Sequence, residues 1–111
     1  MIFEPLDLVV VPFPFTDRRT VKRRPALIIS SAAFNAGHQQ SILAMITSAR
    51  TKWMSDVAIQ DWREAGLNVP CKVRLKLFTL DDVLIFRKVG ALTERDRRAV
   101  KGALTRFLTI G

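Results

Sequence analysis

Residues 6–30 read LDLVVVPFPFTDRRTVKRRPALIIS, and this stretch decides the fold. Its first part, Leu6 to Val11, is apolar and rich in β-branched residues, which favour strands. Pro12-Phe13-Pro14 ends that pattern, because proline has no N–H to donate to a sheet. Ala26 to Ser30 resumes as a second buried strand just after Pro25. The stretch therefore predicts two strands joined by a long, hairpin-like loop that carries basic residues.

The chain that follows this hairpin predicts further short strands and one long helix. Strands are expected at Ser41–Thr47, Val57–Ile59 and Val73–Phe78, with one or two more within Asp82–Val89. Short helical segments are expected at Ala32–Gly37 and Asp61–Ala65, each ended by a glycine. After Thr93 as N-cap, with Asp96 at the third helical position, apolar residues recur with helical period through Phe107.

Many short strands with one terminal helix predict a mainly β fold with some α structure, a small and strongly bent antiparallel barrel. We expect a single domain over residues 1–111. In the strand Val73–Phe78, the side chains of Val73, Leu75 and Leu77 should face the core and those of Arg74, Lys76 and Phe78 the basic outer side. The predicted core comprises Leu8, Val10, Leu27, Ile29, Leu43, Met45, Val73, Leu75, Leu77, Leu84, Val100, Leu104 and Phe107.

The composition is that of a globular protein, with 49% hydrophobic and 25% charged residues among 111. Its longest apolar stretches are far shorter than the roughly 20 residues of a membrane-spanning helix. The N-terminus lacks the basic start and apolar run of a secretory signal. The only cysteine, Cys71, can form neither a disulfide within the chain nor a metal site by itself. These features favour a cytoplasmic protein.

The positive charge is concentrated in one part of the sequence. The formal net charge is +8. Between the consecutive acids Asp17 and Asp56 no carboxylate occurs, and seven cations lie there: Arg18, Arg19, Lys22, Arg23, Arg24, Arg50 and Lys52. Lysine and arginine displace the counterions condensed on phosphates, so a polyanion is the natural partner. A merely solubilising surface would mix both signs, as the rest of the chain does.

Familiar enzyme signatures are missing from the sequence. It has no glycine-rich phosphate loop, serine elbow, paired cysteines or helical histidine pair. His38 is the only histidine, so a two-histidine acid/base mechanism is excluded within one chain. We expect no metal and no cofactor. Trp53 is a candidate for stacking on bases or for packing, whereas Trp62 is expected in the core.

The ordered motifs of the chain resemble the PemK/MazF family of toxins. The resemblance covers nearly the whole chain and rests on Phe13-Pro14-Phe15-Thr16-Asp17, Arg23-Arg24-Pro25-Ala26-Leu27-Ile28-Ile29-Ser30, Ile46-Thr47-Ser48, Asp61-Trp62-Arg63-Glu64-Ala65-Gly66-Leu67, Phe78-Thr79-Leu80-Asp81 and Arg87-Lys88-Val89-Gly90-Ala91-Leu92. It implies an SH3-like barrel with a C-terminal helix and a homodimer. It also implies metal-independent, sequence-specific cleavage of single-stranded mRNA by an endoribonuclease (mRNA interferase) that a cognate antitoxin with an acidic, partly disordered tail holds in check.

The resemblance also assigns site residues. Arg24 matches the family's catalytic arginine before proline, Thr47 matches a catalytic threonine or serine, and Ser48 is the alternative. Metal-free cleavage normally uses the substrate's own 2′-hydroxyl, so the enzyme must supply charge to the phosphate. RNA-binding roles are expected for Phe15, Thr16, Asp17, Lys22 and Arg23, in a flap over the RNA, and for Arg50, Lys52, Arg74 and Lys76 along its backbone.

The chain departs from common family features at three places. Leu75-Lys76 replaces an acid-glutamine pair, so no carboxylate acid/base role carries over there. Where family members commonly have Gly-Asp, this chain has Leu6-Asp7, and where they commonly have Pro-Ser, it has Pro70-Cys71. Cys71 is therefore expected to be an inert replacement for serine.

Two other functions remain compatible with the fold: a non-catalytic SH3-like module that binds nucleic acid, and a toxin that poisons DNA gyrase. Cleavage of RNA requires Arg24 and Thr47 on one concave face.

Overall fold

The computed structural model describes residues 2–13 and 22–109, and their strands form one antiparallel sheet. The six strands are β1 (Asp7–Phe13), β2 (Lys22–Ile28), β3 (Gln40–Thr47), β4 (Val57–Ala58), β5 (Lys72–Asp81) and β6 (Arg87–Ala91), in the order β4-β5-β3-β2-β1-β6. The helices are α1 (Ala32–His38), the 3₁₀ turn η1 (Asp82–Leu84) and α2 (Glu94–Phe107).

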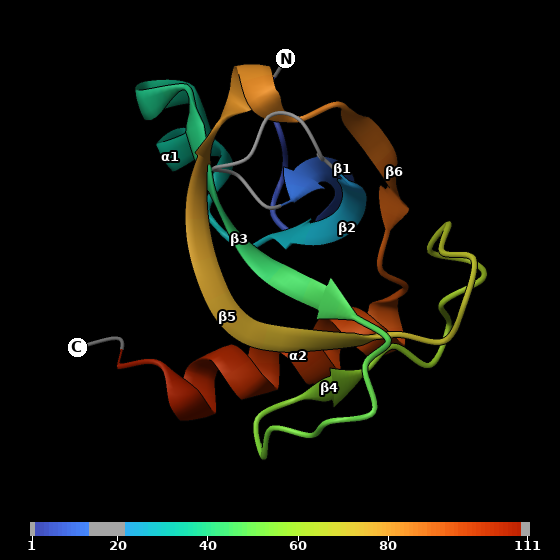
Figure 1. Cartoon of the computed structure of the whole chain (residues 1–111). Coiled ribbons are helices and arrows are strands. Elements are labelled where there is room, and N and C mark those ends of the chain that lie inside the picture. Colours follow the sequence, from blue (N-terminus) through green and yellow to red (C-terminus); the bar gives the residue numbers. More distant parts are fainter. Residues whose placement is uncertain (1, 14–21, 110–111) are drawn as a thin grey trace.

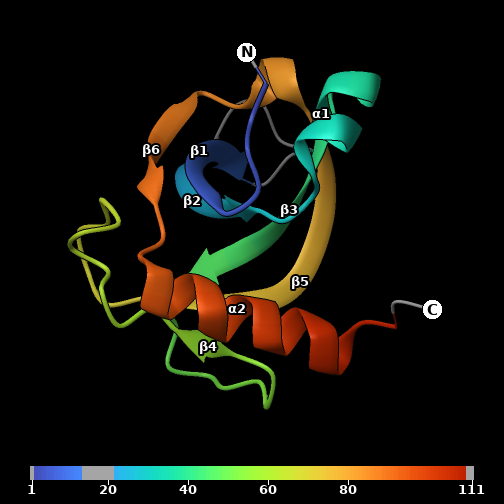
Figure 2. The same ribbon diagram turned by 180° about the vertical axis from the view of Figure 1, so that it is seen from behind.

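The sheet curls into an open half-barrel, as Figure 1 shows, with α1 and α2 at opposite ends. From behind, α2 crosses the end of the half-barrel beside β4 and β5 (Figure 2). The predicted mainly β fold with a bent antiparallel barrel and a terminal helix is confirmed. Neither helix in the described part of the chain has the length and apolar character needed to cross a lipid bilayer.

Two hydrophobic clusters lie on the two faces of the sheet. The larger cluster contains Leu8, Leu27 and Val73, and α2 covers it through the fully buried Val100. The smaller cluster contains Val9, Ile28 and Leu43, with Ile85 after η1 packed against them. Neighbouring residues of β1 and β2 therefore enter different clusters, because successive side chains of a strand point to opposite faces.

The alternation predicted for residues 73–78 is wrong beyond Val73. Met45 pairs with Arg74 and Ala44 pairs with Leu77, so Leu75 and Lys76 of β5 have no partner on β3. Such a bulge bends a strand and changes which face its side chains point to. Leu77, which follows the bulge, is 38% exposed. Arg74, which precedes it, is buried because it contacts Thr51 and Asp56 of the loop before β4.

The predicted core is partly confirmed. Leu8, Leu27, Leu43, Val73 and Val100 are fully buried. Leu77 and Leu84 are exposed, since one follows the bulge and the other lies in η1 rather than in a strand. The remaining predicted core residues are half-buried: Val10, Ile29, Met45, Leu75, Leu104 and Phe107.

The N-terminus of α2 is tied to the segment that precedes β5. Asp96, only 1% exposed, accepts the backbone N–H groups of Gln60 at 3.0 Å and Asp61 at 2.8 Å. Thr93 is the N-cap residue, but its hydroxyl donates to the Asp61 carboxylate at 2.6 Å instead of capping the helix. Residues 60–66 therefore form consecutive turns, and the helix predicted at Asp61–Ala65 is wrong. Trp62 packs against the larger cluster, as predicted.

The same segment presses against β6 at a glycine. A Cβ atom on Gly90 would lie 2.1 Å from the backbone oxygen of Ala65, and Gly66 next to it has a φ of +98°. Only glycine allows this close approach of two backbones. Gly102 in α2 differs, because a Cβ there would meet nothing within 4 Å.

Substitution by alanine should have opposite effects on stability at Gly90 and at Gly102. Gly90→Ala should lower the free energy of unfolding by roughly 1–3 kcal/mol or more, because the Ala65 carbonyl must move. Gly102→Ala should raise it by about 0.5–1 kcal/mol, because alanine has the higher helix propensity and space is available. Urea denaturation followed by circular dichroism measures both, and equal effects at the two positions would contradict the packing described.

Candidate functional site

Lys22, Arg23 and Arg24 belong to β2 rather than to a loop, and Pro25 lies inside this strand. Residues 22–27 of the strand pair with β1, Val11 lying opposite Arg24, whereas β3 pairs only with residues 26–28. Proline is tolerated at this position because β2 has a single neighbour there, so no hydrogen bond to β3 is lost. The first half of β2 thus has one free edge, and Arg24 lies on it.

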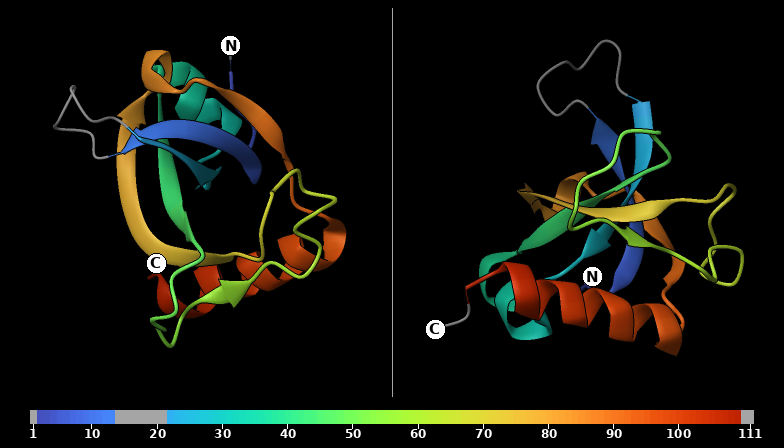
Figure 3. Two further views of the ribbon diagram at one scale, coloured as in Figure 1. Left: turned by 45° about the vertical axis from the view of Figure 1, so that its right-hand side comes forward. Right: turned by 90° about the horizontal axis from the view of Figure 1, so that it is seen from below.

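Beyond Ala26 and Met45 the strands β2 and β3 separate. β3 continues along β5, where Thr47 pairs with Lys72, while β2 follows β1 (Figure 3). A hollow of about 400 Å³ lies between the diverging ends and is called the first hollow here. It is lined by Val11, Phe13, Arg24, Pro25, Met45, Ile46, Thr47, Ser48, Ala49 and Phe78. The two predicted catalytic side chains, Arg24 and Thr47, therefore share one concave surface.

The polar groups of the first hollow suit an anionic substrate. Arg24 and Ser48 are exposed and Thr47 is half-buried. The Thr47 hydroxyl oxygen accepts the backbone N–H of Ala49 at 3.1 Å, which leaves the hydroxyl proton available for a phosphate oxygen. The described residues that line the hollow include no carboxylate. A guanidinium and a hydroxyl thus face a cavity whose other walls are mainly apolar.

The other predicted RNA-binding residues lie in different surroundings. Lys22, Arg23, Arg50, Lys52 and Lys76 are exposed, and the Arg23 guanidinium lies 4.4 Å from the centre of the Phe86 ring. Phe15, Thr16 and Asp17 lie outside the described residues. His38 is exposed, packs on Phe34 in α1, and does not line the first hollow.

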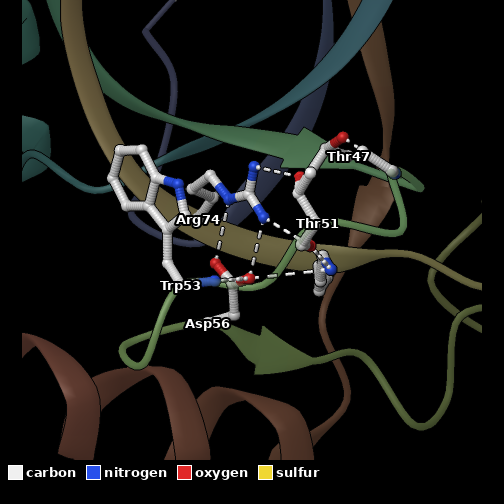
Figure 4. A network of polar contacts seen from close by, with 7 residues as sticks. Thr47, Thr51, Trp53, Asp56 and Arg74 are labelled. Carbon is white, nitrogen blue, oxygen red and sulfur yellow. Dashed lines mark hydrogen bonds and ion pairs between the residues drawn. The ribbon is translucent and has the colours of Figure 1, made fainter.

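Arg74 was expected to follow the RNA backbone, but its side chain is only 8% exposed and its donors are engaged within the chain. Figure 4 shows its guanidinium between the Asp56 carboxylate and the Trp53 ring. Nε and Nη2 donate to Asp56 at 3.1 and 3.0 Å, and Nη2 also donates to the Thr51 carbonyl at 2.8 Å. Arg74 thereby fixes residues 51–56, the loop that follows Thr47 and Ser48.

Asp56 is a functional residue that the sequence analysis missed. In the sequence, Asp56 was noted only as the acid that ends the acid-free stretch. In the structure, its carboxylate accepts the Trp53 N–H at 2.8 Å and lies 3.6 Å from Lys72 Nζ. The hydrogen bond from Arg74 lowers the pKa of Asp56, and the charges of Arg74 and Lys72 act in the same direction. Asp56 is the first acid after seven cations, and this position in the sequence could have indicated that it pairs with a cation.

Trp53 packs against Arg74, one of the two roles considered for it, and stacking on bases stays a prediction. Its ring centre lies 5.0 Å from the Arg74 guanidinium, and 43% of the residue is exposed. Its contact with Arg74 adds to the fixation of the loop, since a cation over an indole face is attracted by the ring quadrupole. The exposed part of Trp53 is available to a ligand.

No group of three or more His, Cys, Asp or Glu side chains in residues 2–13 and 22–109 could hold a metal ion. Cys71 is half-buried, donates to the Val69 carbonyl at 3.0 Å, and has its pKa raised by burial. This thiol is neutral near pH 7 and therefore a poor nucleophile. Its surroundings agree with the expected inert role.

Solved structures of an endoribonuclease and of two MazF proteins share this fold. An endoribonuclease from a Mycobacterial species, in complex with its cognate antitoxin, superposes with a TM-score of 0.78 at 16% identity, covering 98% of this chain and 97% of that one. MazF from Deinococcus radiodurans gives 0.72 at 24% identity, with 97% of each chain covered. Mycobacterium tuberculosis toxin MazF-mt6 gives 0.71 at 20% identity, covering 90% and 93%. At these identities the similarity establishes the fold.

The family follows from the sequence itself. Residues 4–108 match the model of the PemK-like, MazF-like toxins of type II toxin-antitoxin systems, so the chain belongs to this family. No curated protein matched the sequence. The resemblance inferred from the motifs is therefore confirmed at the level of the family.

The Arg74–Asp56 pair gives a prediction for stability. Asp56→Ala removes the carboxylate that pairs with the Arg74 guanidinium and should lower the free energy of unfolding. The double variant Asp56→Ala/Arg74→Met should be more stable than Asp56→Ala alone, because no unpaired charge remains. Urea denaturation of four proteins provides the comparison: the unmodified protein, Asp56→Ala, Arg74→Met and the double variant. Additive losses would show that the two side chains do not act as a pair.

The pair also predicts a pH dependence. The pKa of Asp56 is lower in the folded state than in the unfolded state. The contribution of Asp56 to the free energy of unfolding is therefore complete above the unfolded-state pKa, and it is lost as the pH falls through the folded-state pKa. The stability difference between the protein and Asp56→Asn should therefore be constant from about pH 7 to 5 and should shrink below about pH 4. A difference that stays constant to pH 3 would contradict the ion pair.

Proposed function

We propose that this chain is the toxin of a type II toxin-antitoxin system and acts as a sequence-specific endoribonuclease on single-stranded mRNA, without a metal ion. The observation that carries the proposal is the meeting of Arg24 and Thr47 in the first hollow. Membership of the PemK-like, MazF-like family supports it, as do the fold neighbours that are endoribonucleases. Neither a gyrase poison nor a non-catalytic module requires these two side chains to share a hollow.

In the proposed mechanism the ribose 2′-oxygen attacks the adjacent phosphorus while the bond from phosphorus to the 5′-oxygen breaks. The products are a 2′,3′-cyclic phosphate and a 5′-hydroxyl, the 2′-oxygen losing a proton and the 5′-oxygen gaining one. Extra negative charge develops on the non-bridging oxygens, which the Arg24 guanidinium stabilises. The Thr47 hydroxyl donates to the same phosphate, with Ser48 beside it.

Binding of the remaining RNA is assigned to exposed cations outside the first hollow. Lys22, Arg23, Arg50, Lys52 and Lys76 contact backbone phosphates, and the RNA-binding roles of Phe15, Thr16 and Asp17, which lie outside the described residues, stay predictions from the sequence. Arg74 acts differently from our expectation: it holds the loop after Ser48 in place and contributes little direct contact.

The partners follow from the same site. An acidic antitoxin segment would compete with RNA for the basic surface, and two neighbours of this fold were solved with their antitoxins, one a Mycobacterial endoribonuclease and one a MazE-MazF complex from Deinococcus radiodurans. The family resemblance implies a homodimer, and the exposed side chains of Val83 and Leu84 offer an apolar surface that a second copy would cover. Cleavage of mRNA places the protein in the cytoplasm.

The first test is the chemistry of cleavage. The purified protein should cut single-stranded RNA in EDTA and leave 2′,3′-cyclic phosphate ends, detected by mass spectrometry. An oligonucleotide with a 2′-deoxy sugar at the cut site should remain intact, because its nucleophile is absent. The mechanism is wrong if RNA is not cut, or if the deoxy substrate is cut equally well.

The second test concerns Arg24. Arg24→Ala should reduce the single-turnover cleavage rate by about 10²- to 10³-fold, as the loss of a fixed charge stabiliser typically does. Because Arg24 is exposed, the circular dichroism spectrum and unfolding midpoint should be retained. Arg98→Ala, which removes an equally exposed charge on α2, is the matched control and should cut at the original rate. Loss of folding in Arg24→Ala would instead indicate a structural role.

A further inference from the structure

A second hollow, of about 450 Å³, lies on the other face of the ribbon formed by β1 and β2. Its floor contains Val10, which pairs with Pro25 on one side and Arg87 on the other, so these three share one face of the sheet. Arg23 lies on the same face as Pro25, two residues away. The turn segment 66–71 closes the hollow opposite the floor.

The two hollows meet at Arg24. Alternation along β2 puts the Arg24 side chain on the face of the sheet that carries Val11 and the first hollow. Arg24 and Pro25 nevertheless line both the first and the second hollow. This is possible because β2 has a free edge here, where its pairing with β3 has ended. Arg24 is therefore positioned on the rim between two cavities that open on opposite faces of the sheet.

The chemistry of 2′-hydroxyl cleavage calls for such an arrangement. The attacking 2′-oxygen, the phosphorus and the departing 5′-oxygen must come into line, and the reacting atoms must be held in that geometry. A continuously stacked strand does not present them in line, so the nucleosides on the two sides of the phosphate have to diverge. An enzyme that supplies one binding cavity to each nucleoside offsets the free-energy cost of unstacking the bases.

We propose that the second hollow binds one of the two nucleosides that flank the scissile phosphate, while the first hollow binds the other and Arg24 holds the phosphate between them. This inference rests on the proposed endoribonuclease function. Leu67, Val69 and Val89 provide apolar walls for the base, and the Asn68 amide, which both donates and accepts, contacts its edge. Arg87 neutralises the next phosphate along the chain.

The electrostatics of the second hollow agree with a nucleotide. Three arginines line it, Arg23, Arg24 and Arg87, and the described lining residues include no carboxylate. Cys71 adds no negative charge, because burial raises the pKa of its thiol. A cavity of this volume lies within the range of about 300–1,000 Å³ typical of small-molecule sites.

The decisive experiment compares base preferences on the two sides of the cut. A single-stranded RNA library with randomised positions is cleaved, and both new ends are sequenced. Asn68→Ala should flatten the preference at one flanking position by about tenfold or more, because a base-edge hydrogen bond is lost. Met45→Ala, which changes only the wall of the first hollow, should change the preference at the other flanking position.

Two further variants separate recognition from general damage. Asn68→Asp replaces the amide donor by an acceptor and should change which base is preferred at the Asn68-dependent position. Arg98→Ala should leave both preferences as they are. The second hollow is not a nucleoside site if the Asn68 variants cut with unchanged preference, or if they alter both flanking positions equally. Absence of cleavage by the unmodified protein would instead refute the proposed function.

Thiol labelling gives a readout that does not depend on cleavage. Cys71, the only cysteine of the chain, lines the second hollow. An oligonucleotide with a 2′-deoxy sugar at the cut site, at saturating concentration, should slow maleimide labelling of Cys71 severalfold. Unchanged labelling, with binding verified by fluorescence anisotropy, would overturn the proposal.

Discussion

The whole site depends on the place where β2 and β3 stop pairing. The last pair is Ala26 with Met45, and two features of the chain prevent its continuation. Pro25 has no N–H to offer to β3, and the bulge of β5 opposite Ala44 and Met45 turns β3 away. The strands separate, a cavity opens between them, and Arg24 is left on a free edge. Had the pairing continued, Arg24 and Thr47 would be neighbours within a closed sheet.

Local patterns in the sequence predicted most of the fold. The apolar, β-branched stretches of β1 and β3 and the helical period of α2 depend on near neighbours along the chain, so they could be found without a structure. The bulge could not, because it is defined by which residues of β3 lie opposite Leu75 and Lys76. The turns at Asp61 could not be predicted either, because the Asp61 carboxylate accepts the hydroxyl of Thr93, 32 residues later in the chain.

The site was predicted unevenly for a similar reason. Arg24 and Thr47 stand in motifs that a family shares, so sequence placed them correctly in one cavity. Arg74 was assigned by charge alone, and charge does not reveal whether a partner is present. Its partner Asp56 is 18 positions away, and the pairing became visible only when the loop was seen folded over β5. Asp56 is thus paired with two cations, Arg74 and Lys72, and weakens the attraction for phosphates little.

The free edge of β2 has a consequence for how proteins of this design diversify. One cavity beside Arg24 is built by the end of β3, and the other by segment 66–71 with β6. These parts are separate in the sequence and contribute to different cavities. Mutations in either part can accumulate without disturbing the arginine between them. With the function proposed above, related enzymes of this design can keep one chemistry while the RNA sequence that they cut changes one base at a time.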